Sequence, residues 1–225
     1  MLWVLDGEQL WNRKVGSAGK ACAECHGDSR TGLKGVAARY PAFDKALGRP
    51  VDLEQRINLC RSNRQQATPL PFESRDLLAI TAFVARQSEG VAIETGGDPL
   101  LAPFIAKGRD RFMQRQGQLN LGCTNCHDEN WDKRLAGSAI TQGHPTGYPL
   151  YRLEWQSLGS LQRRLRACIT GIRAQPYDYG SPELVELELL VELELLDELE
   201  LDELVELEVE LLTLPDEVEV EVELL

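Results

Sequence analysis

Two short motifs with the same spacing hold most of the reactive side chains of this 225-residue chain. Cys22-Ala23-Glu24-Cys25-His26 and Cys123-Thr124-Asn125-Cys126-His127 both have the form C-x-x-C-H. In this pattern the two thiols can add to the vinyl groups of haem as thioethers, and the adjacent histidine can bind the iron. A redox dithiol or half of a zinc site also uses C-x-x-C. Because both copies carry the histidine, we expect two covalently bound haem c groups.

The second axial ligand of each iron has to come from elsewhere in the chain. Methionine is a common choice, but Met1 and Met113 both precede the second motif, and neither follows the motif of its own unit. The soft ligands that do follow the motifs are Cys60 and Cys168. We therefore expect four iron ligands from the protein: His26, Cys60, His127 and Cys168.

Two alternatives use the same residues differently. Cys60 and Cys168 could form a disulfide in an oxidising compartment, which would leave both irons without an obvious second ligand. His144 is the one histidine outside the motifs, and it could compete as a ligand of the second iron. We favour the two cysteine ligands because this choice gives each of the six cysteines a role.

Arginines lie near both candidate ligand cysteines. Cys60 is followed by Arg61 and Arg64. The arginines near Cys168 are Arg163, Arg164, Arg166 and Arg173. Arg164 precedes Cys168 by four residues and would share its face of a helix. These charges could stabilise a thiolate and the haem propionates, or they could also bind an anionic substrate.

The two motifs belong to a tandem repeat. They are offset by 101 residues, and the same offset relates Gly7 to Gly108 and Trp11 to Phe112. A cysteine, a proline and an apolar helical segment follow each motif in the same order, with about seven extra residues in the second copy. Matched landmarks of this kind indicate a duplicated unit.

The repeat divides the chain into domains. We place a first haem domain at about 1–90 and a second, with the candidate active site, at about 97–195. The apolar spacing predicts helices over Gly7–Val15, Leu53–Asn63, Ser74–Gln87, Lys107–Gln116 and Leu161–Ala167. Few strand patterns precede the C-terminal region, so we expect a mainly α-helical protein of two tandem cytochrome c-like domains with long loops.

Charge is distributed unevenly along the chain. The net charge is −12, from 24 basic and 36 acidic residues, but 18 of the acidic residues and no Lys or Arg lie in 181–225. Residues 1–180 therefore carry 24 basic and 18 acidic groups, a net charge of +6. An acidic chain is not expected to bind nucleic acid. We interpret 196–225, which has no counterpart in the repeat, as a low-complexity acidic tail or an artefact of expression or design.

The cellular compartment follows from the haem chemistry. The sequence contains no run of about 18 apolar residues, so we expect no membrane span. The N-terminus lacks the basic and apolar regions of a signal peptide. Because haem c is attached outside the cytoplasm, we expect an exported, periplasmic protein whose leader is absent from this chain.

Two segments resemble the SoxA family, the A subunits of the SoxAX cytochromes of bacterial thiosulfate oxidation. Residues 164–176, which include Cys168, resemble the family's active-site segment, and residues 57–62 resemble the segment with the axial cysteine of its first haem. Both C-x-x-C-H motifs also fit this family. The resemblance extends from about Gly7 to Glu188.

The resemblance implies an activity and its partners. It implies an L-cysteine S-thiosulfotransferase subunit that pairs with the monohaem cytochrome SoxX and oxidatively couples thiosulfate to a cysteine of the SoxYZ carrier. Cys168 would be the active-site ligand, carried as a persulfide, and Arg164 would steer the thiosulfate anion. The first haem, held by His26 and Cys60, would be a structural or low-potential centre. The alternative is a plain periplasmic dihaem electron carrier with cysteine ligands.

Overall fold

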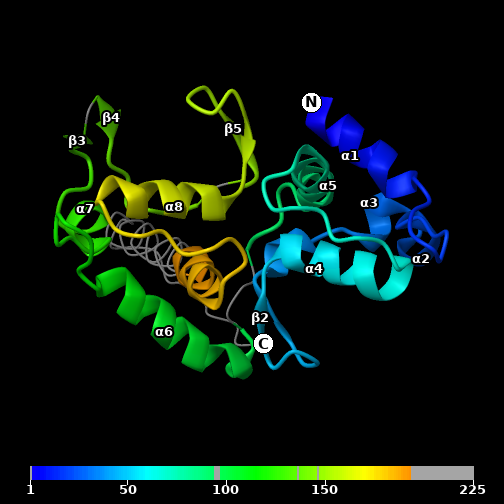
Figure 1. The fold of residues 1–225 in the computed structure, drawn as a ribbon, viewed down its shortest axis with the longest axis horizontal. Helices are drawn as coiled ribbons and strands as arrows, with labels where there is room; N and C mark the ends of the chain where they lie inside the picture. The colour runs from blue at the N-terminus through cyan, green and yellow to red at the C-terminus, as the bar shows by residue number, and fades with distance from the viewer. Residues whose placement is uncertain (1, 94–96, 136, 146, 194–225) are drawn as a thin grey trace, which may run out of the picture.

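The computed structural model describes residues 2–93, 97–135, 137–145 and 147–193, and it is mainly helical, as predicted (Figure 1). The longer helices are α1 (Leu2–Asn12), α4 (Leu53–Cys60), α5 (Arg75–Arg86), α6 (Ala102–Met113) and α8 (Leu161–Gly171). The shorter helical segments are α2 (Ala23–His26), α3 (Ser29–Gly32), η1 (Ala37–Arg39), η2 (Arg61–Gln65), η3 (Pro99–Leu101) and α7 (Thr124–His127). A further helix occupies residues 182–193.

Short antiparallel hairpins interrupt the helices, although the sequence patterns did not indicate them. Their strands are β1 (Ala42–Asp44) with β2 (Arg49–Val51), β3 (Arg134–Leu135) with β4 (Ser138–Ala139), and β5 (Leu150–Arg152) with β6 (Ser157–Gly159). In the first hairpin Ala42 lies opposite Val51, and in the third Leu150 lies opposite Gly159. The first hairpin leads directly into α4 and the third into α8, so the two hairpins direct the helices that carry Cys60 and Cys168.

The two predicted entry helices are confirmed, but both are displaced toward the N-terminus. α1 and α6 start before Gly7 and Lys107 and end at Asn12 and Met113. The residues after them form isolated β-bridges, Val15 with Lys20 and Gln116 with Leu121. Because these pairings are extended, they end the helices early and turn the chain into each C-x-x-C-H motif.

The predicted helix over Ser74–Gln87 is also confirmed. The Ser74 hydroxyl accepts a hydrogen bond from the backbone N–H of Leu77 and so caps the start of α5. The apolar face of α5 packs against α1 and against the residue that follows α3, and this cluster has five buried members: Trp11, Leu33, Ile80, Phe83 and Val84. Burial of this face, rather than helix propensity alone, stabilises α5.

The helix at 182–193 begins inside the region that the acidic composition marked as unusual. Its residues Leu187, Leu190 and Val191 pack against Phe112 and Leu161. In Figure 1 this orange helix lies between α6 and α8. Residues 194–225, with the predicted end of the second domain near 195 and the acidic tail at 196–225, lie outside the described residues.

The buried carboxylate at Glu186 shows how an acidic sequence can pack in this helix. Its Oε2 accepts a hydrogen bond from Arg111 Nε at 2.8 Å, and the Glu186 side chain is only 4% exposed. The guanidinium of Arg111 also lies over the ring of Tyr177. An ion pair with a positioned arginine therefore compensates part of the cost of burying this charge.

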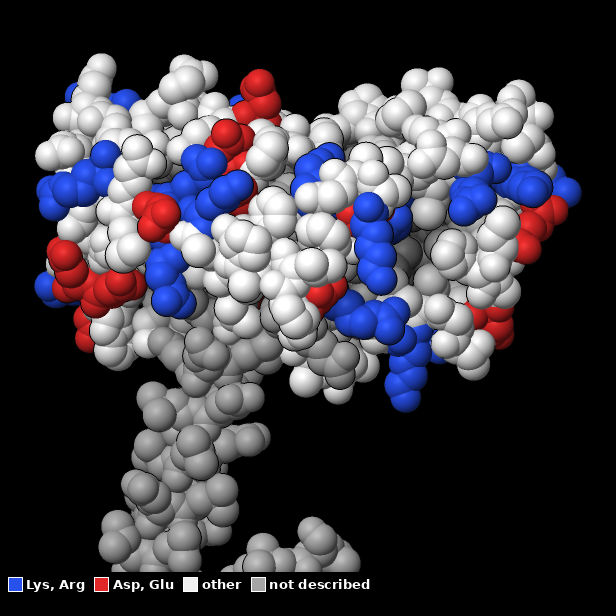
Figure 2. Space-filling view, turned by 90° about the horizontal axis from the view of Figure 1, so that it is seen from below, with Lys and Arg blue, Asp and Glu red and all other residues white. Residues whose placement is uncertain are grey.

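Figure 2 shows one face of the molecule, with Lys and Arg side chains spread across it and Asp and Glu side chains in smaller groups among them. This distribution agrees with the positive net charge of residues 1–180. Within the described ranges, no helix is both long enough and apolar enough to cross a bilayer.

Gly7 and Gly108 mark two equivalent helix crossings. A Cβ at Gly7 would lie 2.1 Å from the carbonyl oxygen of Ala79 on α5, and a Cβ at Gly108 would lie 2.2 Å from that of Glu186. Each entry helix therefore touches a later helix backbone to backbone, which only glycine permits. These matched contacts support the tandem repeat, which stays a prediction.

Replacing Gly108 with alanine is expected to destabilise the protein by about 1–3 kcal/mol, because the added methyl overpacks the crossing of α6 with 182–193. Urea unfolding of the haem-loaded chain would measure the change. Gly97→Ala is the matched control, since no atom lies within 4 Å of a Cβ there. Equal stability of the two variants would contradict the crossing.

Candidate haem sites and the Cys168 pocket

The first C-x-x-C-H motif lies on α2, beside α1. The ring of Trp11 packs against the ring of His26, with centroids 5.3 Å apart, and against Phe83 on α5, with centroids 5.8 Å apart. Cys22 is half-buried, whereas Cys25 and His26 are exposed. The repeated aromatic residue found in the sequence therefore supports the histidine of the motif.

Cys60 lies at the C-terminal end of α4, close to this motif. Burial raises the pKa of the Cys60 thiol, the guanidinium groups of Arg56 and Arg64 lower it, and the Cys25 thiol raises it. Cys60 in turn acts on the pKa of Cys22. The structure thus brings the predicted second ligand of the first haem close to both motif cysteines.

The Arg61 side chain, which the sequence placed near Cys60, interacts with Thr68 and Cys22 instead. Its Nε and Nη2 donate to the carbonyl oxygen of Thr68 at 3.3 and 3.2 Å. Burial raises the pKa of the Cys22 thiol, which a hydrogen bond from Gln65 and the charge of Arg61 lower. The charge of Arg61 therefore acts on Cys22, the first cysteine of the motif, whereas Arg56 and Arg64 act on Cys60.

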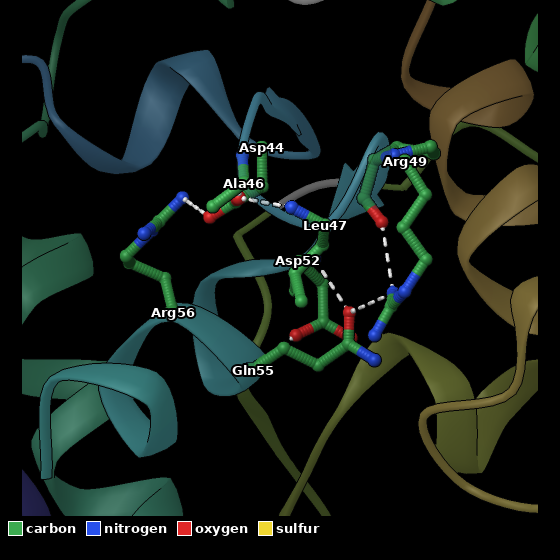
Figure 3. Close-up of polar contacts among 8 residues, drawn as sticks. Asp44, Ala46, Leu47, Arg49, Asp52, Gln55 and Arg56 are labelled. Atoms are coloured by element: carbon green, nitrogen blue, oxygen red, sulfur yellow. Dashed lines mark hydrogen bonds and ion pairs between the residues drawn. The ribbon is translucent and has the colours of Figure 1, made fainter. Parts of the chain in front are cut away.

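Arg56 is a residue near Cys60 that the sequence interpretation missed. Its Nη2 donates to Asp44 Oδ2 at 2.7 Å, and Asp44 itself accepts from the backbone N–H groups of Ala46 and Leu47 (Figure 3). Arg56 precedes Cys60 by four residues on α4. The same spacing singled out Arg164 in the second unit, so the helix-face rule could have found Arg56 too.

The second motif lies on α7, and its histidine is oriented by the backbone. His127 Nδ1 lies 2.6 Å from the carbonyl oxygen of Thr141, and its ring centroid lies 6.3 Å from that of Phe112. A hydrogen bond from Nδ1–H to a carbonyl leaves Nε2 as the free lone pair. His127 is therefore held in the tautomer that binds iron.

Cys168 lies on α8, near the cysteines of this second motif. Burial raises the pKa of its thiol, Arg164 lowers it, Cys126 raises it, and Arg152 lowers it. Burial also raises the pKa of Cys123 to about 12, with smaller contributions from Cys168 and Cys126. The predicted ligand cysteine, the motif thiols and two arginines thus lie within electrostatic reach of one another.

The structure separates the predicted arginine group into members with different surroundings. Arg164 is the member that acts on Cys168. The others are placed elsewhere: Arg163 over the ring of Trp155 at 4.6 Å, Arg166 over the ring of Tyr179 at 4.4 Å, and Arg173 in the turn after α8. Arg152 on β5 was missed, because only the tertiary fold brings this strand to Cys168.

The two alternatives for the axial ligands can be compared with this geometry. Cys60 and Cys168 are both free thiols, each beside its own motif, so the alternative disulfide is not formed. The backbone of Gly143, next to His144, packs against the His127 ring, since a Cβ there would lie 3.2 Å from the ring. This places the loop that carries His144 beside the second motif.

The residues present fit haem c in both units. Each unit has two thiols for the vinyl groups, a histidine and a further cysteine. The indole Nε1 of Trp11, next to His26, is buried without a hydrogen-bond partner among the described residues, so an acceptor from outside the chain could satisfy it. The His127–Thr141 contact likewise prepares Nε2 for a metal.

Comparisons with known proteins agree with this geometry. The family described as SoxA/TsdA, cytochrome c domain, matches residues 6–93, which implies haem c as a cofactor. The chain is 36% identical over 190 residues to the L-cysteine S-thiosulfotransferase subunit SoxA of Pseudaminobacter salicylatoxidans, covering 84% of this chain and 66% of that protein. It is also 36% identical over 189 residues to the subunit of the same name from Rhodovulum sulfidophilum, with the same coverage.

The fold is similar as well. The crystal structure of SoxXA from P. pantotrophus superposes with a TM-score of 0.81 at 29% identity, covering 85% of this chain and 72% of that chain. The chain spans 66% of the length of the first two relatives, just under two thirds. From the shared cytochrome c domain, the shared fold and these relatives, we conclude that the chain belongs to the SoxA family.

Proposed function

We propose that this chain is the dihaem subunit of a periplasmic L-cysteine S-thiosulfotransferase, which couples thiosulfate oxidatively to a cysteine of a carrier protein. The observation that carries the proposal is the surroundings of Cys168. Its side chain is half-buried near the second motif, and the charges of Arg164 and Arg152 act on the thiol. The SoxA relatives supply the reaction class through their name.

Two haem c groups would be bound, one in each predicted domain at 1–90 and 97–195. Their thioether bonds would come from Cys22, Cys25, Cys123 and Cys126, and their axial ligands would be His26 with Cys60 and His127 with Cys168. Each haem, when bound, supplies a one-electron acceptor. The protein contributes ligand orientation, as in the His127–Thr141 contact. It also places two arginines near Cys168, Arg152 and Arg164, which lie 2.9 and 3.9 Å from Glu154 Oε1.

Arg164 and Arg152 are suited to bind thiosulfate. Thiosulfate is a dianion, and a guanidinium group donates two parallel hydrogen bonds to an oxyanion. In the overall reaction one sulfur–sulfur bond forms between thiosulfate and the carrier cysteine, the thiol proton leaves, and two electrons are removed. We expect Cys168 to carry the extra sulfur atom of a persulfide close to Arg164.

The partners follow from the relatives. The P. pantotrophus structure contains SoxA together with SoxX. We propose a SoxX-type monohaem cytochrome as the partner that accepts the electrons, and the SoxYZ protein as the carrier of the cysteine. Because haem c is attached outside the cytoplasm, this assembly would work in the periplasm.

Mass spectrometry and an activity assay together test the proposal. A tryptic peptide with Cys168 is expected to be heavier by one sulfur atom, which a thiol reductant removes, and the haem-loaded chain with SoxX should conjugate thiosulfate to SoxYZ. An unmodified Cys168 in a chain that exchanges electrons but conjugates no thiosulfate would instead identify a plain dihaem electron carrier.

Arg164→Ala is expected to raise the KM for thiosulfate about 10- to 100-fold, because a charge-assisted hydrogen bond to the anion is lost. Steady-state kinetics at varied thiosulfate concentration would measure it. Arg109→Ala, at an exposed position on α6, serves as the control for loss of one positive charge. A KM equal to that of the control would remove Arg164 from the binding site.

A further inference from the structure

The N-terminal turn of α8 is bound by a carboxylate from the other half of the chain. Glu73 Oε1 accepts hydrogen bonds from the backbone N–H of Ser160 at 3.2 Å and from its hydroxyl at 2.5 Å. Ser160 is the N-cap of α8, and its Oγ accepts from the backbone N–H of Arg163. A negative charge at this end also interacts favourably with the helix dipole.

Glu73 is itself held in a fixed conformation. Its φ of 60° lies in the left-handed region, which costs free energy for a residue with a side chain. The next residue, Ser74, is the N-cap of α5, and its N–H donates to the carbonyl of Pro71. The Glu73 side chain is only 15% exposed. The contact to Ser160 therefore starts from a rigid anchor on α5.

The Glu73 carboxylate contacts the first of two neighbouring arginines on α8, Arg163 and Arg164. Arg163 Nη1 lies 3.5 Å from Glu73 Oε2, and its guanidinium stacks on Trp155. Arg164, one residue later, points about 100° further around the helix and acts on Cys168. Glu73 thus contacts the face of α8 next to the one that carries Arg164 and Cys168.

A second contact in the same turn limits how far the helix end can move. Gln162 Nε2 donates to Asp52 Oδ2 at 2.7 Å and to Glu188 Oε2 at 3.1 Å, and Gln162 Oε1 accepts from Gly180 N–H at 2.7 Å. These bonds fix Gln162 from several sides. Glu73 adds the bond to the N-cap itself and thus fixes the direction in which α8 leaves the β5–β6 hairpin.

We propose that Glu73 is a positioning residue for the second site: it sets the direction and rotation of α8 and thereby places Cys168 and Arg164 relative to the second motif. Its effect on catalysis rests on the proposed function, but its effect on the ligation of the second haem does not. The first half of the chain thus contributes to the geometry of the second site through one carboxylate.

Electron paramagnetic resonance of the haem-loaded, full-length chain tests this role. The signal that changes in Cys168→Ser identifies the second haem. Glu73→Ala is expected to shift that signal and to leave the signal of the first haem unchanged. With SoxX and SoxYZ, kcat/KM for thiosulfate should fall about 10- to 100-fold, because misplacement of reacting and binding groups by about 1 Å has such an effect.

Two further variants separate positioning from a general loss of structure. Glu73→Gln keeps an oxygen that can accept from Ser160, so it should restore the second-haem signal and keep kcat/KM within about threefold of the unchanged protein. Ser160→Ala removes the hydroxyl partner, and its effect should not add to that of Glu73→Ala. Glu89→Ala, at an exposed ion pair with Arg86, is the matched control.

The results that overturn the proposal are specific. An unchanged second-haem signal in Glu73→Ala would do so, as would equal shifts of both haem signals or additive effects of Glu73→Ala and Ser160→Ala. If Glu73→Ala does not fold, Ser160→Ala takes its place as the variant expected to shift the second-haem signal, and Glu73→Gln stays the variant expected to leave it unchanged. Absence of transferase activity in the unchanged protein would remove the proposed function, while the resonance spectra still test Glu73.

Discussion

Replacing Cys168 with serine is expected to lower thiosulfate conjugation by at least about 10³-fold, while the chain still carries two haems. The sulfur that accepts or holds thiosulfate is lost, and loss of a reacting side chain has effects of this size or larger. Haem content should not change, because the thioether bonds come from the two C-x-x-C-H motifs. A conjugation assay with SoxX and SoxYZ measures the first quantity and a pyridine haemochrome spectrum the second.

Cys60→Ser is the matched control for this experiment. It removes the corresponding cysteine beside the first motif, where Arg56 and Arg64 act on the thiol. We expect it to change the spectrum of the first haem and to retain most of the conjugating activity. Full activity in Cys168→Ser, or equal loss in both variants, would show that Cys168 is not the reacting sulfur.

Raising the pH from 5 to 8 is expected to destabilise the protein by about 2 kcal/mol or more, because buried carboxyl groups meet next to Gln162. Burial raises the pKa of Asp52 to about 6 and that of Glu192 to about 8, and it raises the pKa of Glu188 well above its usual range. Burial likewise raises the pKa of Glu54 beside them.

The sign follows from proton binding. These groups hold their protons more tightly in the folded chain than in the unfolded one, so the folded state binds more protons between about pH 4 and pH 8. Their contribution is fully favourable below their ordinary pKa values and is lost as the pH rises through about 6 and 8.

Glu188→Gln should weaken the dependence of the free energy of unfolding on pH. The amide can still accept the hydrogen bond from Gln162 but carries no charge beside Asp52. We expect a higher free energy of unfolding at pH 8, by about 1–2 kcal/mol, and a smaller difference at pH 5. Urea unfolding at several pH values, with exposed Glu8→Gln as control, measures both. Identical pH profiles for Glu188→Gln and the unchanged chain would contradict the interpretation.

Local sequence signals predicted the parts of the site that lie close together in the chain. Both haem motifs, the helices that carry Cys60 and Cys168, and the Arg164 spacing all depend on interactions within a few residues. Ser74 and Ser160 cap their helices through neighbouring N–H groups. Such short-range interactions can be read from residue order alone.

Other parts of the site depend on long-range contacts. Arg152 reaches Cys168 because a hairpin folds over α8, and Glu73 meets Ser160 across 87 residues. No spacing rule connects such positions. The acidic composition was also misleading for residues 182–193, where Arg111 and Gln162 provide partners for buried glutamates that a one-dimensional charge count cannot include.

The crossing of α1 with α5 at Gly7 bears on how the segment between these helices folds. Gly7 touches Ala79, which is 72 residues later, so the first haem motif and Cys60 both lie inside one long closed loop. With an iron joined to His26 and Cys60, this loop is divided into shorter ones, and the unfolded chain loses conformational entropy. Haem in this position would act as an internal cross-link, and its removal should loosen the segment between α2 and α4 before α1 separates from α5.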